Sequence, residues 1–255
     1  MMTLEPHGPD TYVARGPSYP WGGLYGGQIV AQALRAAAAT VDEGVPPHSL
    51  HAYFIRRGDA AEPIRFEVER LRNGRSFVTR AVVARQSTGA ILSMAASFQV
   101  EEGGPDVQTA RPPDGLAGPD AVTAESWSAM FDRRAHTDRP AGRASAWLRM
   151  IDPIGADAVL QACALAYLSD DMPTDAVASL HPGGARWADE GWYSASLDHA
   201  IWFHQPSRAD EWQLHEFSAE RYQGSRGVSL GRVFVGTDHV ATVAQEVLLR
   251  PRRGG

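Results

Sequence analysis

The apolar run from Ile29 to Val41 limits the fold of this chain more than any other stretch. It consists almost entirely of alanine, valine, isoleucine and leucine, with Gln32, Arg35 and Thr40 as its polar exceptions. Alanine-rich composition favours the helix, and a helix that is apolar nearly all round is buried. Because alanine side chains are small, such a helix is thin and can be enclosed closely. We therefore expect a buried helix here, wrapped by a curved sheet.

The segments after this run predict an antiparallel meander. Asn73-Gly74 supplies the positive φ of a tight hairpin turn at little cost, and Ser87-Thr88-Gly89 predicts a second turn. We expect residues 1–24, which are rich in proline, glycine and aromatics, to form an irregular lead-in. The segments around the two turns have the composition of strands: His51–Arg57, Pro63–Arg72, Ser76–Gln86 and Ala90–Val100.

The composition changes after residue 100, where glycine and proline predict a linker. We expect a first unit over residues 1–105, a linker or irregular segment over 106–143, and a second unit over 144–255. The second unit follows the order of the first, because a helical stretch interrupted near Pro173 precedes another meander. Its expected elements are an entry strand Ala144–Met150, the helical stretch Ala156–Leu180, and the strands Ser194–His204, Glu211–Arg221, Gly227–Gly236 and Val240–Leu249.

Charge and cysteine content exclude several classes of protein. The 255 residues carry a net charge of -6, whereas a nucleic-acid-binding protein shows a basic excess or stripe. The single cysteine, Cys163, excludes an internal disulfide and a zinc site built on cysteines. No run of about 18 apolar residues is present, so we expect no membrane span. The N-terminus lacks a basic stretch followed by an apolar one, and we expect a soluble, cytoplasmic protein.

Polar side chains interrupt the apolar stretch from Ser194 to Pro206, which we expect to pass through the middle of a domain. Buried polar groups need hydrogen-bond partners, so such a strand has a network or a site beside it. The acidic turn Asp170-Asp171 lies upstream, and Gln245 lies downstream in an apolar run. We expect these three segments to converge.

The two halves differ at the positions that matter for this expectation. Aligning the two helical stretches places Gln28 opposite Asp170, and aligning the last strands places Ala96 opposite Gln245. The complete polar set is therefore expected in the second half alone.

Four segments, in the same order, resemble the acyl-CoA thioesterase II family. They are Tyr25-Gly26-Gly27-Gln28-Ile29-Val30-Ala31-Gln32-Ala33-Leu34, His48-Ser49-Leu50-His51-Ala52-Tyr53-Phe54, Leu197-Asp198-His199-Ala200-Ile201-Trp202-Phe203-His204 and Val243-Ala244-Gln245-Glu246. The resemblance covers residues 20–250 and implies an α+β double hotdog: two tandem repeats of a long buried helix wrapped by a curved antiparallel β-sheet. The units over 1–105 and 144–255 would then be the N-terminal and C-terminal hotdogs.

The resemblance also implies a catalytic set. The family uses an aspartate in the second helical segment, a hydroxyl on the following strand and a glutamine on the last strand. By position these are Asp170, Ser196 and Gln245. Asp171 remains an alternative to Asp170, because a slip of one residue would exchange them.

The chemistry implied is hydrolysis of fatty or related acyl-CoA thioesters to the free acid and coenzyme A. It requires a positioned water, a base and donors to the developing oxyanion. Asp170 would deprotonate the water, Ser196 and Gln245 would hold it in line, and backbone N–H groups near a helix N-terminus would supply the donors. No metal, cofactor or covalent intermediate is required, since coenzyme A is part of the substrate.

Other interpretations of the same residues stay open. Asp170 or Asp171 could simply cap a helix. Asp198 and His199 are adjacent on a strand, so they point to opposite faces and do not form an acid/base pair; we interpret both as structural. The pattern from Gly227 to Gly231 matches the nucleophile elbow of serine hydrolases, but no helix is expected after it. The histidines lack metal-binding spacing.

Two rival functions share the expected fold. A hotdog hydratase or dehydratase normally has an Asp/His pair in the helical segment, and the segment from Tyr167 to Thr174 contains no histidine. A catalytically idle hotdog would bind acyl chains or a protein. We also expect a homo-oligomer. Five arginines are candidates for contact with the phosphates of coenzyme A: Arg56, Arg57, Arg75, Arg226 and Arg232.

Overall fold

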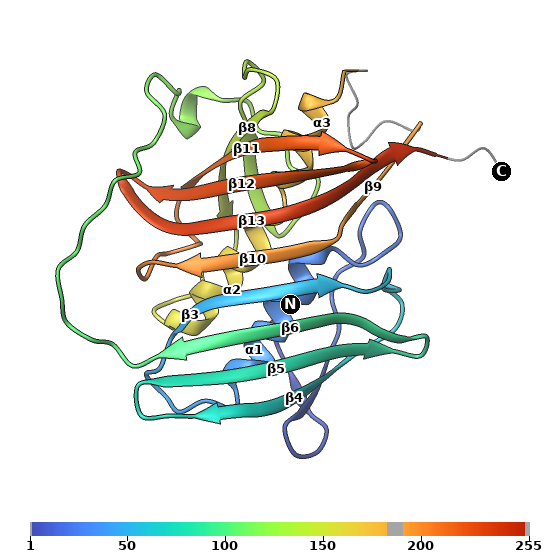
Figure 1. The fold of residues 1–255 in the computed structure, drawn as a ribbon, viewed down its shortest axis with the longest axis vertical. Coiled ribbons are helices and arrows are strands. Elements are labelled where there is room, and N and C mark those ends of the chain that lie inside the picture. Colours follow the sequence, from blue (N-terminus) through green and yellow to red (C-terminus); the bar gives the residue numbers. More distant parts are fainter. Residues whose placement is uncertain (1, 183–190, 253–255) are drawn as a thin grey trace.

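A single antiparallel sheet runs the length of the protein in its computed structural model, which describes residues 2–182 and 191–252 (Figure 1). The strands of the first half are β1 (Glu5–Pro6), β2 (Thr11–Ala14), β3 (Pro47–Phe54), β4 (Ile64–Asn73), β5 (Phe77–Gln86) and β6 (Gly89–Gln99). Those of the second half are β7 (Phe131–Ala135), β8 (Arg143–Met150), β9 (Trp192–Ser196), β10 (Asp198–Phe203), β11 (Gln213–Gln223), β12 (Arg226–Val235) and β13 (Asp238–Pro251).

The order of the strands shows how the two halves meet. It is β1-β2-β4-β5-β6-β3-β10-β13-β12-β11-β8-β7, with β9 paired to β13 beside this path. The halves join where β3 pairs with β10, with Ala200 opposite His51 and Ile201 opposite Leu50. The hairpin expected at Asn73-Gly74 connects β4 to β5. β10 belongs to the stretch after Ser194 that we expected to pass through the middle of a domain. It lies between β3 and β13, near the middle of the sheet.

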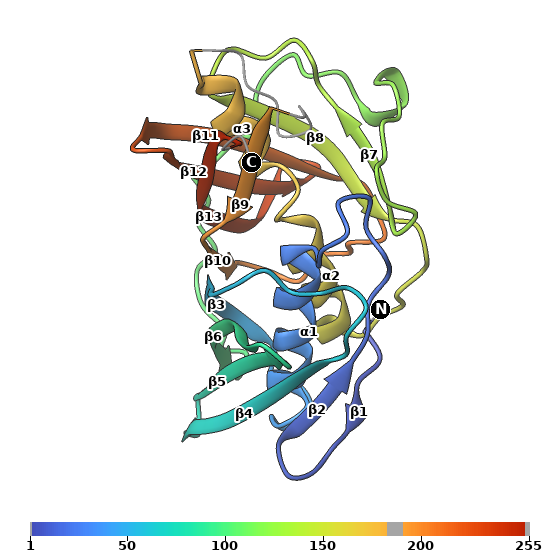
Figure 2. The ribbon, with the colours of Figure 1, turned by 90° about the vertical axis from the view of Figure 1, so that its right-hand side faces the viewer.

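The helix α1 (Gly26–Ala38) lies on the inner side of the first half, where it packs against β3, β4, β5 and β6 (Figure 2). Ten of its thirteen residues are buried, including both glutamines, Gln28 and Gln32. Its alanines allow close packing, and the side chains of Val30 and Leu34 are fully buried. The buried helix expected from composition is confirmed, although it begins three residues before Ile29.

The second half carries two shorter helices, α2 (Ala158–Leu168) and α3 (Pro173–Leu180). Asp157 caps α2, because its carboxylate accepts hydrogen bonds from the N–H groups of Val159 and Leu160 at 2.9 and 3.0 Å. Pro173 begins α3, since proline is well suited to the first helical position. The expected interruption near Pro173 is confirmed. α2 packs against α1, and α3 packs against β8, β11, β12 and β13.

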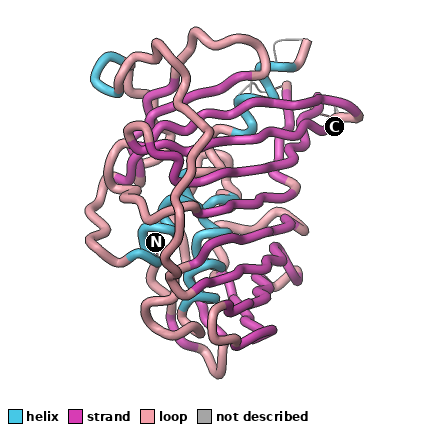
Figure 3. The backbone as a smooth tube through the Cα atoms, turned by 60° about the vertical axis from the view of Figure 1, so that its left-hand side comes forward, coloured by secondary structure: helices cyan, strands magenta, loops and turns pink. Residues whose placement is uncertain are grey.

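Figure 3 shows the strands stacked along the long axis with the helices on one side of them. Three features differ from the expectations. The stretch expected as one strand from Ser194 to His204 is divided at Leu197 into β9 and β10. The segment 106–143, expected to be irregular, contains β7, which pairs with β8. The lead-in contains β1 and β2, and β2 pairs with β4.

Residues 2–182 and 191–252 include no helix that is both long and apolar enough to cross a membrane. Cys163, the single cysteine of the sequence, is a buried free thiol in α2.

Candidate active site

Asp170 lies in the short turn between α2 and α3 and is 6% exposed. Ser169 is the C-cap of α2, and Pro173 begins α3, so only a few residues are left for the turn. A carboxylate held at this point faces the sheet and the start of α1. The local sequence therefore puts an ionisable group in the interior, where it needs hydrogen-bond donors.

The structure brings the three expected residues into one hydrogen-bonded chain. The Ser196 hydroxyl donates to Asp170 Oδ1 at 2.9 Å. The Gln245 Nε2 group donates to Ser196 Oγ, also at 2.9 Å. Ser196 is the last residue of β9, and Gln245 lies on β13, which pairs with both β9 and β10. The three segments thus converge as expected.

The first half of the chain supplies a further donor. The backbone N–H of Gly27, in the first turn of α1, donates to Asp170 Oδ2 at 2.8 Å. The positive end of the helix dipole also favours a negative charge here. The close approach requires glycine, because a Cβ on Gly26 would lie 2.6 Å from Asp170 Oδ2 and one on Gly27 would lie 2.4 Å from Tyr167 O. Sequence reasoning gave neither glycine a role at the site, although both belong to the first motif quoted above.

Burial raises the pKa of Asp170 to about 6, while the hydrogen bonds from Ser196, Gln245 and Gly27 act in the opposite direction. The desolvation of the carboxylate is the largest of these effects. The group is then mostly ionised at neutral pH, yet it is a much stronger base than an exposed aspartate. A pKa near the working pH suits a general base.

Asp171 has a different environment from its neighbour. The indole Nε1 of Trp127 donates to Asp171 Oδ1 at 2.6 Å, and Arg133 Nε donates to Oδ2 at 2.8 Å. Arg133 also bonds Asp175 of α3 at 2.5 Å. Asp171 therefore fastens the α2–α3 turn to β7, and of the two adjacent carboxylates only Asp170 reaches Ser196 and Gln245.

Asp198 and His199 point to opposite faces of β10, as expected. Asp198 Oδ1 accepts the N–H of Glu246 at 2.6 Å. His199 is buried, its Nε2 lies 2.9 Å from Ser169 Oγ, and its Nδ1 is hydrogen-bonded to Gln245 Oε1. We interpreted His199 as structural; its contact with Gln245 places it beside the expected catalytic set.

Ser229 lies beside this set, because it is the register partner of Gln245 where β12 pairs with β13. Ser229 sits in the middle of β12 rather than at a strand-to-helix turn, so it lacks the geometry of a nucleophile elbow. Arg56 and Arg57 donate to the backbone carbonyls of Thr88 and Trp21, and Arg226 pairs with Glu246. Within residues 2–182 and 191–252, no group of three or more His, Cys, Asp or Glu side chains is placed to hold a metal ion.

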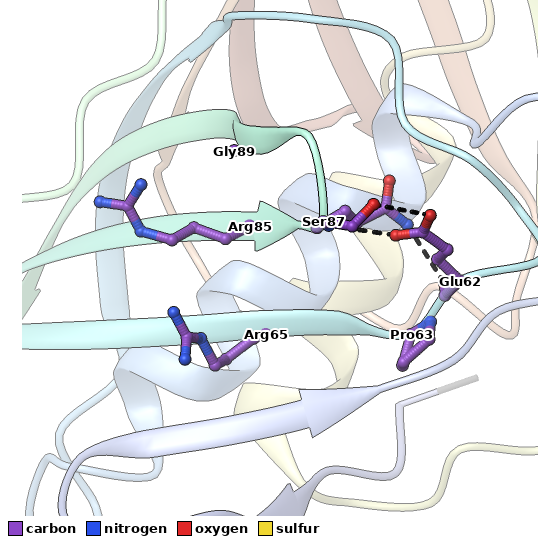
Figure 4. A pocket seen from close by; sticks show the side chains of 7 residues that line it. Glu62, Pro63, Arg65, Arg85, Ser87 and Gly89 are labelled. Carbon is purple, nitrogen blue, oxygen red and sulfur yellow. Dashed lines mark hydrogen bonds between the residues drawn. The ribbon is translucent and has the colours of Figure 1, made fainter.

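A surface hollow of about 470 Å³ lies on β4, β5 and the adjoining loops (Figure 4), and Asp170 is not among the residues that line it. Arg65 projects into it from β4, between the buried residues Ile64 and Phe66, so it faces outward from the sheet. Both Arg65 and Arg85 pair with Glu67. The hollow is therefore an outer-face feature whose two arginines share the carboxylate of Glu67, and none of the expected site residues lines it.

Comparison with known proteins gives matches along nearly the whole chain. A family model for the acyl-CoA thioesterase N-terminal domain matches residues 15–99, and one for the C-terminal domain matches residues 102–249. The chain is 33% identical to acyl-CoA thioesterase 2 of Haemophilus influenzae, covering 94% of this chain and 93% of that protein. It is also 33% identical to human acyl-coenzyme A thioesterase 8, covering 98% of this chain and 88% of the relative.

Solved structures agree with these matches. The acyl-CoA thioesterase II TesB2 of Mycobacterium marinum has a TM-score of 0.82 and 37% identity over 100% of this chain and 97% of its own. The dehydratase domain of RzxB from Pseudomonas fluorescens has a TM-score of 0.56 at 12% identity over 94% of each chain, which shows a shared fold only. The α+β hotdog fold expected from the sequence is supported by these neighbours and by the large antiparallel sheet.

Proposed function

The chain belongs to the acyl-CoA thioesterase II family, and on that premise we propose how it hydrolyses its substrate and which residues take part. It is a thioester hydrolase that converts an acyl-CoA into a free acid and coenzyme A. We propose fatty or related acyl-CoA as the substrate and Asp170 as the base. The observation that carries the mechanism is the hydrogen-bonded chain from Gln245 through Ser196 to Asp170 at the N-terminus of α1.

Asp170 removes a proton from a water molecule, and the water oxygen forms a bond to the thioester carbonyl carbon. Ser196 and Gln245 hold the carboxylate and the water in line. The tetrahedral intermediate then breaks its C–S bond, and the departing thiolate takes up the proton from Asp170. General-base assistance of this kind contributes about 10² to 10⁴ in rate.

Backbone N–H groups of the first turn of α1 are the donors available to the oxyanion. The first N–H groups of a helix have no acceptor within it and point along the positive end of its dipole. The N–H of Gly27 is occupied by Asp170, so the role falls to its neighbours. One preorganised oxyanion donor is worth about 10² to 10³ in rate. This scheme uses side chains, backbone and water alone, without a metal or cofactor.

We also propose that the two halves are tandem repeats of one hotdog, over residues 1–105 and 144–255, joined by 106–143. Three observations support this architecture. Each half combines helix with a run of antiparallel strands. The halves meet through one strand from each, β3 and β10. The two family models divide the chain near residue 100.

A hydratase or dehydratase is less well supported on the same fold. That chemistry pairs an aspartate with a histidine, whereas Asp170 is held by Ser196 and the N–H of Gly27. The likeness to a dehydratase domain extends to the fold alone. Both family models and the curated relatives are thioesterases.

A homo-oligomer is part of the proposal. The outward face of the sheet exposes Tyr53 of β3, Trp202 of β10 and Leu230 of β12 by 68%, 38% and 45%, and burying such apolar surface is favourable. We further propose a cytoplasmic location and a role in lipid metabolism, with no nucleic-acid partner. Light scattering of the purified protein tests the homo-oligomer, and fractionation of its host cells tests the cytoplasmic location.

The test of function is thiol release from acyl-CoA substrates of increasing chain length, measured for the wild type, Asp170→Asn and Gln245→Ala. We expect turnover by the wild type and a loss of about 10² or more in kcat for Asp170→Asn. A folded wild type that hydrolyses none of the series would contradict the activity. Full activity of Asp170→Asn would instead support the thioesterase activity and contradict the assignment of Asp170 as the base. Asp171→Asn would then be measured next.

A further inference from the structure

His199 is a buried side chain that contacts the catalytic set but takes no part in the scheme above. It lies on β10, the strand at which the two halves join, and is 1% exposed. Its two ring nitrogens reach in different directions. Nε2 lies 2.9 Å from Ser169 Oγ, and Nδ1 is hydrogen-bonded to Gln245 Oε1.

These contacts close a ring around the candidate base. Asp170, Ser196, Gln245 and His199 are joined by successive hydrogen bonds, and His199 reaches Ser169, which directly precedes Asp170 in the chain. Gln245 is therefore held from both sides, by Ser196 through Nε2 and by His199 through Oε1. A closed network of this kind restricts each member more than an open chain would.

The carboxylate sets the direction of every hydrogen bond in the ring. An ionised Asp170 can only accept, so Ser196 must donate to it. The Ser196 oxygen then accepts from the Gln245 amide N–H, which leaves Gln245 Oε1 facing His199. Since Oε1 is an acceptor, His199 Nδ1 must carry the hydrogen.

The other ring nitrogen completes the assignment. Burial lowers the pKa of His199 to about 4, so the imidazole is neutral at pH 7 and carries one hydrogen only. With Nδ1 protonated, Nε2 is an acceptor. The Ser169 hydroxyl donates to Ala166 O at 3.0 Å in the structure and lies 2.9 Å from Nε2. Because it has one hydrogen, the Nδ1–H tautomer requires the hydroxyl to turn from Ala166 O and donate to Nε2.

We infer that His199, as the neutral Nδ1–H tautomer, is the positioning residue that fixes the side-chain amide of Gln245 so that its N–H faces Ser196. This inference rests on the proposed function, because Gln245 is assigned through it. The Asp170 carboxylate favours the same orientation of the amide, because a hydrogen bond from Gln245 also lowers its pKa, and His199 adds to this hold. Without His199 the amide presents its oxygen to Ser196 in a larger share of the molecules. The Ser196 hydrogen would then be drawn to Gln245 and away from Asp170, and the base would lose its alignment.

Two substitutions separate the two contacts of the imidazole. Asparagine places an amide N–H where Nδ1 stands, so His199→Asn keeps the donor to Gln245. Glutamine places its amide where Nε2 stands, so His199→Gln keeps the link to Ser169 and removes that donor. Positioning of this kind predicts a loss in kcat of about 10-fold or more for His199→Gln and about threefold or less for His199→Asn. KM should change by less than about twofold in both, because neither side chain binds substrate.

A double-mutant cycle with Gln245→Ala distinguishes positioning from packing. If His199 acts through Gln245, His199→Gln should reduce kcat by less than about twofold in the Gln245→Ala protein. Equal losses for His199→Asn and His199→Gln, or the same loss with and without Gln245, would overturn the inference while leaving the thioesterase activity in place. A wild-type rate for Gln245→Ala would overturn the role of Gln245 in the proposed function, and this inference with it.

The tautomer can be observed without any assay of activity. In the wild-type protein labelled with ¹⁵N-histidine, the ring nitrogens of His199 are assigned by their loss in His199→Asn. We expect a neutral ring protonated at Nδ1, and a shift toward the Nε2–H form in Ser169→Ala, where Nε2 has lost its donor. A wild-type ring protonated at Nε2 would contradict the inference even if the enzyme is fully active.

Discussion

Gln28 of α1 and Asp170 beside α2 occupy corresponding positions when the two halves are aligned, yet their surroundings differ. Both side chains are buried. Gln28 Nε2 donates to Gln32 Oε1 at 3.2 Å, and its own Oε1 has no hydrogen-bond partner among the described residues. Asp170 instead has donors at both oxygens. A buried neutral amide tolerates an incomplete set of hydrogen-bond partners, whereas a buried carboxylate does not.

The difference extends to the neighbouring strands. The position that corresponds to Gln245 is Ala96 of β6, which is buried and offers no donor. The first half therefore lacks, at these aligned positions, the polar groups that the second half has. It still contributes to the proposed site, because the N–H of Gly27 donates to Asp170. One complete site thus requires both halves.

The comparison predicts the largest effect at Asp170. Asp170→Asn keeps the size of the side chain and removes the base, so kcat should fall by about 10² to 10⁴. The matched control is Gln28→Leu, which removes the buried unpaired oxygen of the first half and should leave kcat within about twofold. Steady-state thiol release measures both. A comparable loss for Gln28→Leu would mean that the side chain of Gln28 itself takes part in catalysis.

A smaller effect is expected where the halves touch. In Gly26→Ala the new methyl would meet Asp170 Oδ2 at 2.6 Å and the Phe54 ring at 3.0 Å. The carboxylate must move away from Ser196, and misplacement on this scale predicts a loss in kcat of about 10- to 100-fold. Gly103→Ala, at a glycine whose Cβ would meet nothing within 4 Å, is the control. Unchanged kcat in Gly26→Ala would show that α1 does not fix the base.

The pH dependence sharpens the contrast between a base and an amide. In the proposed mechanism Asp170 acts as the carboxylate, and its pKa is about 6, so kcat/KM should rise with pH through about 6 and then level off. Ser196→Ala removes a hydrogen bond that favours the charged form, so the acidic limb should move to higher pH. Ser196→Thr keeps the hydroxyl and should keep the limb in place. A pH-independent kcat/KM between pH 5 and 8 would exclude Asp170 as the titrating base.

The smallest effect concerns stability. The pKa of Asp170 is higher in the folded protein than the roughly 3.9 of an unfolded aspartate. The folded state therefore holds its proton more tightly, and stability is lost as the pH rises from about 4 through 6. Asp170→Asn avoids this loss and should gain up to about 1 to 3 kcal/mol relative to wild type between pH 4 and pH 8. Urea unfolding at the two pH values measures it, and an equal difference at both would contradict the assigned pKa.

The frame of the molecule was predictable because local composition determines it. The alanine-rich run after Gly27 produced a buried helix, and Asn73-Gly74 produced a hairpin. β7 was not predicted, because its five residues become a strand only through pairing with β8. Likewise, Leu197 divides β9 from β10 where its backbone bonds both Glu246 and Phe54, which are distant in sequence.

The site was predictable in its residue types but not in its geometry. Sequence alone could not separate Asp170 from Asp171, since the distinction depends on Arg133 and Trp127 occupying the second carboxylate. His199 likewise shows its contact with Gln245 only once β10 and β13 are paired. Tertiary contacts thus distinguish a residue of the proposed site from a structural one. Spacing in the chain cannot, because it is the same for both interpretations.

The most direct measurement of the central claim is a single turnover of an acyl-CoA by excess enzyme in H₂¹⁸O. If Asp170 acts as a base on water, the first molecules of free acid carry one ¹⁸O, and the peptide that contains Asp170 stays unlabelled. Unlabelled acid in the first turnover, together with ¹⁸O in the Asp170 carboxylate, would show that Asp170 attacks the thioester itself and would contradict the account.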